Sequence, residues 1–126
     1  MMSPFLIAYR YVLPSIRRYL VIELARRGRS EYDIAKMLGI SVSAASRYIN
    51  GRRGALLNLE SDDMTRKEIE RLASELEKGK DVDVEEKLHI IAASLLSRKV
   101  LCPFHYEMDP SPPPANCSVC STLFAK

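Results

Sequence analysis

The sequence has no tryptophan, no glutamine and no apolar run long enough to cross a bilayer, a span that takes about 20 consecutive apolar residues. The apolar N-terminal stretch is interrupted by Pro4, Arg10 and Pro14, and no small-residue cleavage site follows it. We therefore expect neither a signal peptide nor a membrane anchor, and a cytoplasmic protein. The apolar and aromatic residues at 5–12 instead predict a strand or an extended arm, packed on its own domain or on a second subunit.

The motifs of the common enzyme classes are also missing. The chain contains no glycine-rich phosphate loop and no serine-centred nucleophile elbow. A Cys-x2-Cys pair is present at Cys117 and Cys120, but it follows a proline-rich stretch, whereas thiol-disulfide centres place their first cysteine at a helix N-terminus after a strand. We therefore do not expect an enzyme.

Charge is distributed unevenly along the 126 residues. The net charge is +3, yet residues 1–53 hold ten Lys and Arg against three acidic residues, and the remainder holds nine against thirteen. Neutralisation of phosphates supplies most of the non-specific affinity of proteins for DNA. The pattern predicts a nucleic-acid surface in the first half and an acidic second half that faces away from a duplex.

Two short helical patterns meet at Gly39 within residues 30–54, SEYDIAKMLGISVSAASRYINGRRG. Ser30 is placed to cap the first helix, and Gly39 permits the left-handed backbone of a tight turn. Ser41 or Ser43 is placed to cap the second helix. This layout is typical of a helix-turn-helix, in which the second helix enters the major groove of double-stranded DNA.

The segment resembles the phage-repressor (Xre/Cro-type) helix-turn-helix family. The positions that carry the resemblance are Ala35, Gly39, Ile40, Ala45, Ser46, Arg47, Asn50 and Gly51. Two positions depart from it, because Glu31 replaces a glutamine that often contacts the DNA backbone and Ala45 is smaller than the usual branched residue. Upstream, residues 13–28 resemble the opening helix of archaeal predicted regulators, some of which are fused to a thiamine-phosphate synthase domain that is absent here.

These patterns assign roles to individual side chains. The outward residues of the second helix are expected to meet base edges; they are Val42, Ser43, Ser46 and Arg47. Phosphate contacts are expected from Asn50, Arg52 and Arg53, and from Arg17 and Arg18 on a first helix that starts near Pro14 and ends at Gly28.

Two amphipathic helices are predicted in the second half. A capping box at Thr65 and Glu68 precedes the stripe Ile69, Leu72, Ala73 and Leu76, and Asp83 precedes the stripe Leu88, Ile91, Ala92, Leu95 and Leu96. The stripes either pack on each other and on the first domain, or build a homodimer that reads a palindromic operator. The sequence identifies no small-molecule effector.

All three cysteines lie in the C-terminal tail and form, with one histidine, the pattern Cys-x2-His-x11-Cys-x2-Cys: Cys102, His105, Cys117 and Cys120. A proline-rich loop at 109–114 would return the second pair to the first. Such a ligand set is typical of a closed tetrahedral Zn2+ site. An iron-sulfur cluster, which would make the protein a redox or iron sensor, and a Cys117–Cys120 disulfide are the alternatives. The second histidine, His89, is predicted to lie apart from this cluster.

The sequence thus predicts an all-α protein with three regions. Residues 1–60 form the N-terminal arm and helix-turn-helix domain, residues 61–100 a helical region suited to dimerisation, and residues 101–126 a Cys/His metal-binding tail. The favoured function is a sequence-specific transcriptional regulator. The alternatives are an iron-sulfur sensor and an adaptor that binds protein or RNA and carries structural zinc.

Overall fold

The computed structural model describes residues 2–55, 57–108 and 117–125, and in these residues the protein is all-α with no strand. The elements are α1 (Pro4–Ile7), η1 (Ala8–Val12, a π-helical turn), α2 (Leu13–Arg26), α3 (Glu31–Leu38), α4 (Val42–Ile49), α5 (Asp63–Glu77), α6 (Val84–Ser97), α7 (Cys102–Met108) and α8 (Val119–Leu123). The predicted fold class is therefore confirmed. The predicted loop at 109–114 lies outside the described residues.

The N-terminal arm is helical, so the prediction of a strand or extended segment was wrong. The side chain of Ser3 accepts a hydrogen bond from the Phe5 amide and so caps α1, which begins at Pro4. Ile7 and Val12 are fully buried, which shows that core packing overrides the strand preference of this apolar segment. The π-helical turn lies directly before Pro14, whose ring does not fit the interior of a regular helix.

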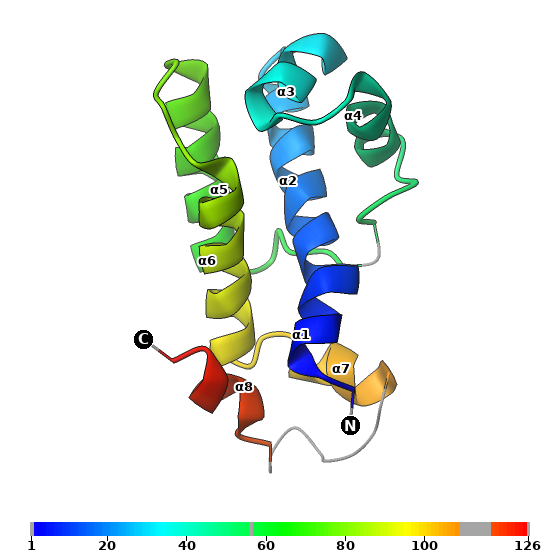
Figure 1. Cartoon of the computed structure of the whole chain (residues 1–126), viewed down its shortest axis with the longest axis vertical. Coiled ribbons are helices and arrows are strands. Elements are labelled where there is room, and N and C mark those ends of the chain that lie inside the picture. The colour runs from blue at the N-terminus through cyan, green and yellow to red at the C-terminus, as the bar shows by residue number, and fades with distance from the viewer. Residues whose placement is uncertain (1, 56, 109–116, 126) are drawn as a thin grey trace.

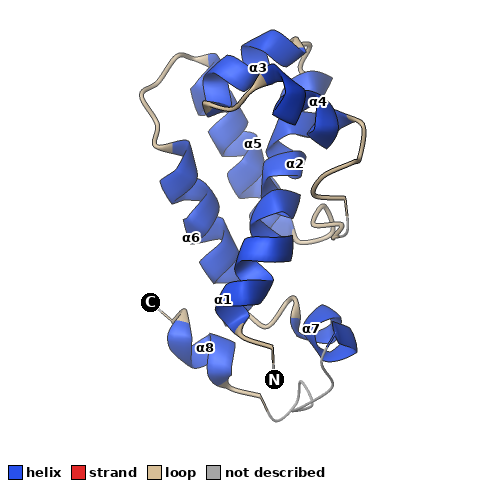
Figure 2. Cartoon of the chain, turned by 45° about the vertical axis from the view of Figure 1, so that its right-hand side comes forward, coloured by secondary structure: helices blue, strands red, loops and turns tan. Residues whose placement is uncertain are grey.

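The core forms where α5 and α6 pack against α2 (Figures 1 and 2). Every residue of the two predicted apolar stripes is buried, as are Ile16, Leu20 and Leu24 of α2. Packing of the stripes on each other and on the first domain is therefore what the structure shows.

The start of α5 differs from the prediction. The N-cap is Asp62, whose carboxylate accepts hydrogen bonds from the amide and the hydroxyl of Thr65. Thr65 lies inside the first turn and is buried, so it does not cap the helix. Asp83 caps α6 as predicted by accepting from the amide of Glu86.

The helices predicted to bind DNA and the C-terminal helices lie at opposite ends of the molecule. Figure 1 shows α3 and α4 near one end of α2, and α7 and α8 beside α1 at the other. Among the described helices, none has the length and apolar composition needed to cross a bilayer.

Candidate functional site

The turn between α3 and α4 has the geometry predicted for it. Ser30 accepts a hydrogen bond from the Asp33 amide, and Ser41 rather than Ser43 caps α4 by accepting from the Ala44 amide at 3.0 Å. Gly39 has φ of 68°, the left-handed conformation that lets the chain turn sharply between the helices. These contacts fix α4 relative to α3.

The outer face of α4 is open to solvent. Val42 is 45% exposed, and Ser43 and Arg47 are exposed as well. Ser46 is half-buried and accepts a hydrogen bond from the side-chain amide of Asn50 at 3.2 Å. In Figure 1, α4 lies on the side of α2 opposite α5 and α6, so the acidic half of the chain does not cover this face. A duplex can therefore reach the predicted base-reading residues.

The C-terminal end of α4 is anchored by a residue that the sequence analysis missed. Tyr48 is 3% exposed, and its backbone carbonyl accepts a hydrogen bond from Nε of Arg18 at 3.1 Å. The guanidinium of Arg53 lies 5.7 Å from the centre of the Tyr48 ring, within the range of a cation–π contact. The signal in the sequence was the three-residue spacing from Ala45, another buried residue of α4.

Intramolecular ion pairs occupy many of the basic side chains on and after α2. Arg17 pairs with Glu85 of α6 at 2.6 Å, so the guanidinium of Arg17 faces α6. The other pairs are Arg26–Glu60, Arg27–Glu23, Arg27–Glu77 and Arg29–Glu77. The hydrogen bond from Arg27, followed by that from Arg29, lowers the pKa of Glu77 below its usual value.

Several basic side chains around α4 form no ion pair. In the described part of the chain, Arg47, Arg52 and Arg53 have no carboxylate partner, and all three are exposed. Lys36 on α3 is likewise exposed and unpaired. Ion pairs thus neutralise part of the basic half, and unpaired positive charge remains beside α4.

The tail residues predicted as metal ligands come close together. Cys102 and His105 on α7 and Cys120 on α8 line one cavity of about 10 Å³, together with Leu96 and Leu101. All three cysteines are free thiols. Across residues 2–55, 57–108 and 117–125, no three Cys, His, Asp or Glu side chains are grouped closely enough to hold a metal ion as they stand.

The polar atoms of this cavity are poorly satisfied. Nε2 of His105 is buried and has no hydrogen-bond partner. Burial raises the pKa of the Cys120 thiol, and the charges of Cys102 and Cys117 raise it further. Burial likewise raises the pKa of Cys102, with a smaller contribution from Cys117 in the same direction. His89 lies elsewhere, exposed on α6, with Nδ1 donating to the carbonyl oxygen of Glu85 at 2.7 Å.

One comparison with known proteins concerns the helix-turn-helix segment. A family model described as a homeodomain-like domain matches residues 14–57, which contain α2, α3, α4 and the turn that follows. The N-terminal part of the chain is a helix-turn-helix domain. The match supports DNA binding, but it does not support the phage-repressor type or a link to thiamine-phosphate synthase. Neither the curated proteins nor the solved structures compared with the chain gave a match.

Proposed function

We propose that this protein is a sequence-specific DNA-binding transcriptional regulator that acts in the cytoplasm without a catalytic step. The observation that carries the proposal is the open face of α4, which is bordered by basic side chains that have no carboxylate partner in the described residues. An exposed helix of this kind fits the width of the DNA major groove.

The side chains of the helix-turn-helix divide into two groups by their position. Val42, Ser43, Ser46 and Arg47 lie on the outward side of α4 and would read base edges. Asn50, Arg52 and Arg53 follow the helix and would hold phosphates, which fixes the register of the protein on the duplex. Arg17 and Arg18 have a supporting role in this arrangement, because both already hold other parts of the fold.

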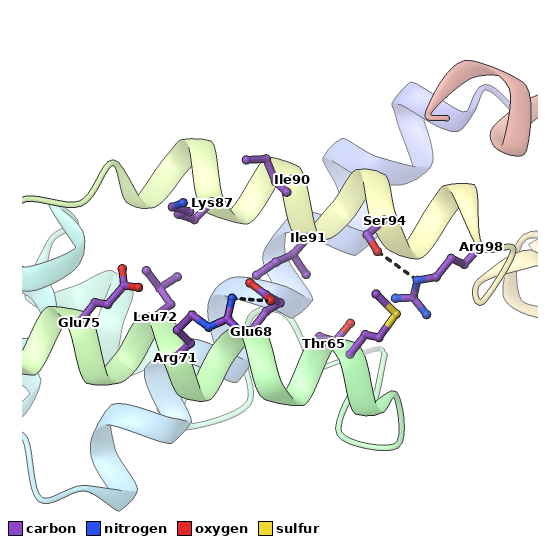
Figure 3. Close-up of a pocket in the computed structure, with 11 residues that line it drawn as sticks. Thr65, Glu68, Arg71, Leu72, Glu75, Lys87, Ile90, Ile91, Ser94 and Arg98 are labelled. Carbon is purple, nitrogen blue, oxygen red and sulfur yellow. Dashed lines mark hydrogen bonds and ion pairs between the residues drawn. The ribbon is translucent and has the colours of Figure 1, made fainter. Parts of the chain in front are cut away.

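We also infer that the regulator is a homodimer whose two copies meet at the groove between α5 and α6. The groove is about 260 Å³ in volume, and Figure 3 shows Ile90 and Ile91 among the residues that line it. Met64, another lining residue, is 55% exposed and Ile90 is 46% exposed, although the stripes beside them are buried within the chain. Packing against a second copy would remove these apolar side chains from water.

The charges of the groove favour a second copy of the chain as its occupant. Glu75 and Lys87 both line it, and neither has an ion-pair partner within the described residues. In a two-fold pair, Lys87 of each copy can approach Glu75 of the other, so one surface is complementary to itself. A two-fold protein in turn matches a palindromic operator.

Selection of bound duplexes from a random pool tests the main proposal. The wild-type protein should enrich one sequence motif in two inverted copies, and its affinity should fall steeply as salt is raised. An adaptor for protein or RNA would bind duplex DNA weakly at low salt and enrich no motif, and that result would overturn the proposal.

A further inference from the structure

The C-terminal tail packs against α1 and η1 at one end of the molecule. Phe124 contacts Phe5 of α1 with ring centroids 5.7 Å apart, and Phe104 on α7 contacts Tyr11 of η1 at 5.4 Å. Helix α8 also packs on α6, where Cys120 is 5% exposed. Two short helices that are separate in the sequence are thereby placed around one small cavity.

Each helix brings two potential ligands. Cys102 and His105 are three residues apart on α7, a spacing that places side chains on the same face of a helix. Cys117 and Cys120 have the same spacing, with Cys117 just before α8 and Cys120 within it. Cys102, His105 and Cys120 line the cavity, and Cys117 lies three residues before Cys120. Closed zinc sites are often built from two such short motifs.

The cavity is small, and Nε2 of His105, which lines it, has no hydrogen-bond partner. A volume of about 10 Å³ is comparable to the space of a single water-sized sphere, which also suits a dehydrated metal ion. A buried imidazole nitrogen without a partner costs free energy, since burial removes its hydrogen bond to water. A metal ion is one group that satisfies a neutral imidazole nitrogen and thiolate sulfurs together.

We propose that Cys102, His105, Cys117 and Cys120 bind one Zn2+ ion that joins α7 to α8. Since the four side chains are not grouped closely enough to hold an ion as they stand, zinc binding requires them to turn into the cavity and draws the two helices together. The ion then closes the tail over α1 and η1, in addition to the aromatic contacts that already join them. The inference concerns the end of the molecule remote from α4, and it is independent of the proposed DNA binding.

The ligand set and the size of the cavity favour a zinc ion over an iron-sulfur cluster. Three thiolates and one imidazole give a four-coordinate, closed site with no open position for substrate, as in structural zinc sites. An iron-sulfur cluster is larger than a single ion and needs room for inorganic sulfides as well as iron. The small volume of the cavity favours the single ion.

The decisive measurement uses the full-length chain purified without oxygen. Elemental analysis should find about one zinc per chain, and the protein should be colourless. After removal of zinc, titration with Co2+ should produce intense visible bands of a tetrahedral thiolate site that saturate near one equivalent. Zinc-free protein that also shows no such bands with Co2+ would overturn the proposal, as would a brown protein containing iron and sulfide.

Variants locate the site on the chain. Cys117→Ser should lose at least nine-tenths of the bound zinc, and Cys117 is only half-buried, so this change spares the core. His89→Asn is the matched control, because it removes the other histidine and should keep the full zinc content. Should Cys117→Ser retain full zinc, or should mass analysis of the anaerobic wild-type protein show a Cys117–Cys120 disulfide, the proposed ligand set is wrong. Since DNA selection reads only the α4 end, its outcome is separate from these results.

Discussion

Gly54 lies against the backbone carbonyl of Pro14, so that a Cβ atom at position 54 would clash with the start of α2. The same glycine has φ of 70°, in the left-handed region. This close approach fixes the turn after α4 to the central helix, together with the hydrogen bond from Arg18 to Tyr48. The position of Arg52 and Arg53 depends on it, because both lie in this turn.

We predict that Gly54→Ala destabilises the protein by about 2 kcal/mol or more, from backbone strain and overpacking together. Gly79→Ala is the matched control: its φ is 73°, but nothing lies within 4 Å of the added Cβ, so only the strain of about 1 kcal/mol applies. Urea denaturation of both variants measures the difference, and DNA affinity should fall for Gly54→Ala alone. Equal losses of stability would show that the approach to Pro14 is not tight.

Salt dependence separates the arginines that hold DNA from those that hold the fold. We predict that Arg52→Ala lowers the slope of log affinity against log salt by about one unit, since one phosphate contact is lost. Arg17→Ala should leave that slope unchanged, because its guanidinium is paired with Glu85. Affinities measured from low to moderate salt give both slopes. A reduced slope for Arg17→Ala would mean that this side chain leaves Glu85 to bind phosphate.

The sequence predicted the features that depend on local patterns. Ser30, Gly39 and Asp83 have the roles expected from capping and turn chemistry, because these contacts span only a few residues. The buried stripes of α5 and α6 were predicted for the same reason, since their period is local.

The errors arose where long-range packing decides. An apolar and aromatic segment fits either a strand or a buried helix, and only its contacts with the core make residues 4–12 helical. The hydrogen bond from Arg18 to the carbonyl of Tyr48, thirty residues away, likewise depends on how α4 packs on α2 and was not foreseen, while the phosphate contact expected of Arg18 stays a prediction. At the start of α5, Thr65 and Glu68 fit the capping-box pattern, but the helix begins earlier and Asp62 is its N-cap.

Because two copies are proposed to meet at the groove between α5 and α6, one charged side chain placed in that groove should disrupt the dimer. Ile90→Glu should convert the dimer to a monomer, because it places a carboxylate where an apolar contact is proposed. Tyr9→Glu is the control: Tyr9 is 76% exposed on η1, and its replacement should leave the dimer intact. Light scattering after size-exclusion chromatography gives the masses. Loss of the dimer in Tyr9→Glu alone would place the interface on the N-terminal helix.

The contact between Asp62 and Arg98 predicts a pH-dependent stability. The bidentate hydrogen bonds from Arg98, at 2.9 Å each, hold the pKa of Asp62 far below its usual range. Since the folded pKa is depressed, the stabilisation is complete above the unfolded pKa of about 3.9 and is lost as pH falls through the folded value.

Asp62→Ala should therefore lower the free energy of unfolding at neutral pH by about 1 to 3 kcal/mol, through loss of both the helix cap and the ion pair. The deficit relative to wild type should shrink below about pH 3. Asp62→Asn keeps the capping oxygen and should recover part of the loss. Urea denaturation across pH measures these differences, and a deficit that does not change with pH would show that the cap alone is responsible.

Arg47 is the side chain on α4 best suited to discriminate a base pair. It is exposed, has no ion-pair partner in the described residues, and carries a guanidinium that can donate two hydrogen bonds to a guanine edge. We predict that Arg47→Ala weakens binding to the preferred site by about 1 to 3 kcal/mol and flattens the preference at one base position of each half-site. Lys67→Ala removes an exposed charge from α5 that lies outside the groove proposed for the dimer, and it should change neither. Repeating the selection with each variant tests this, because a phosphate contact would lower the affinity for all sequences alike, whereas a base contact changes the selected motif.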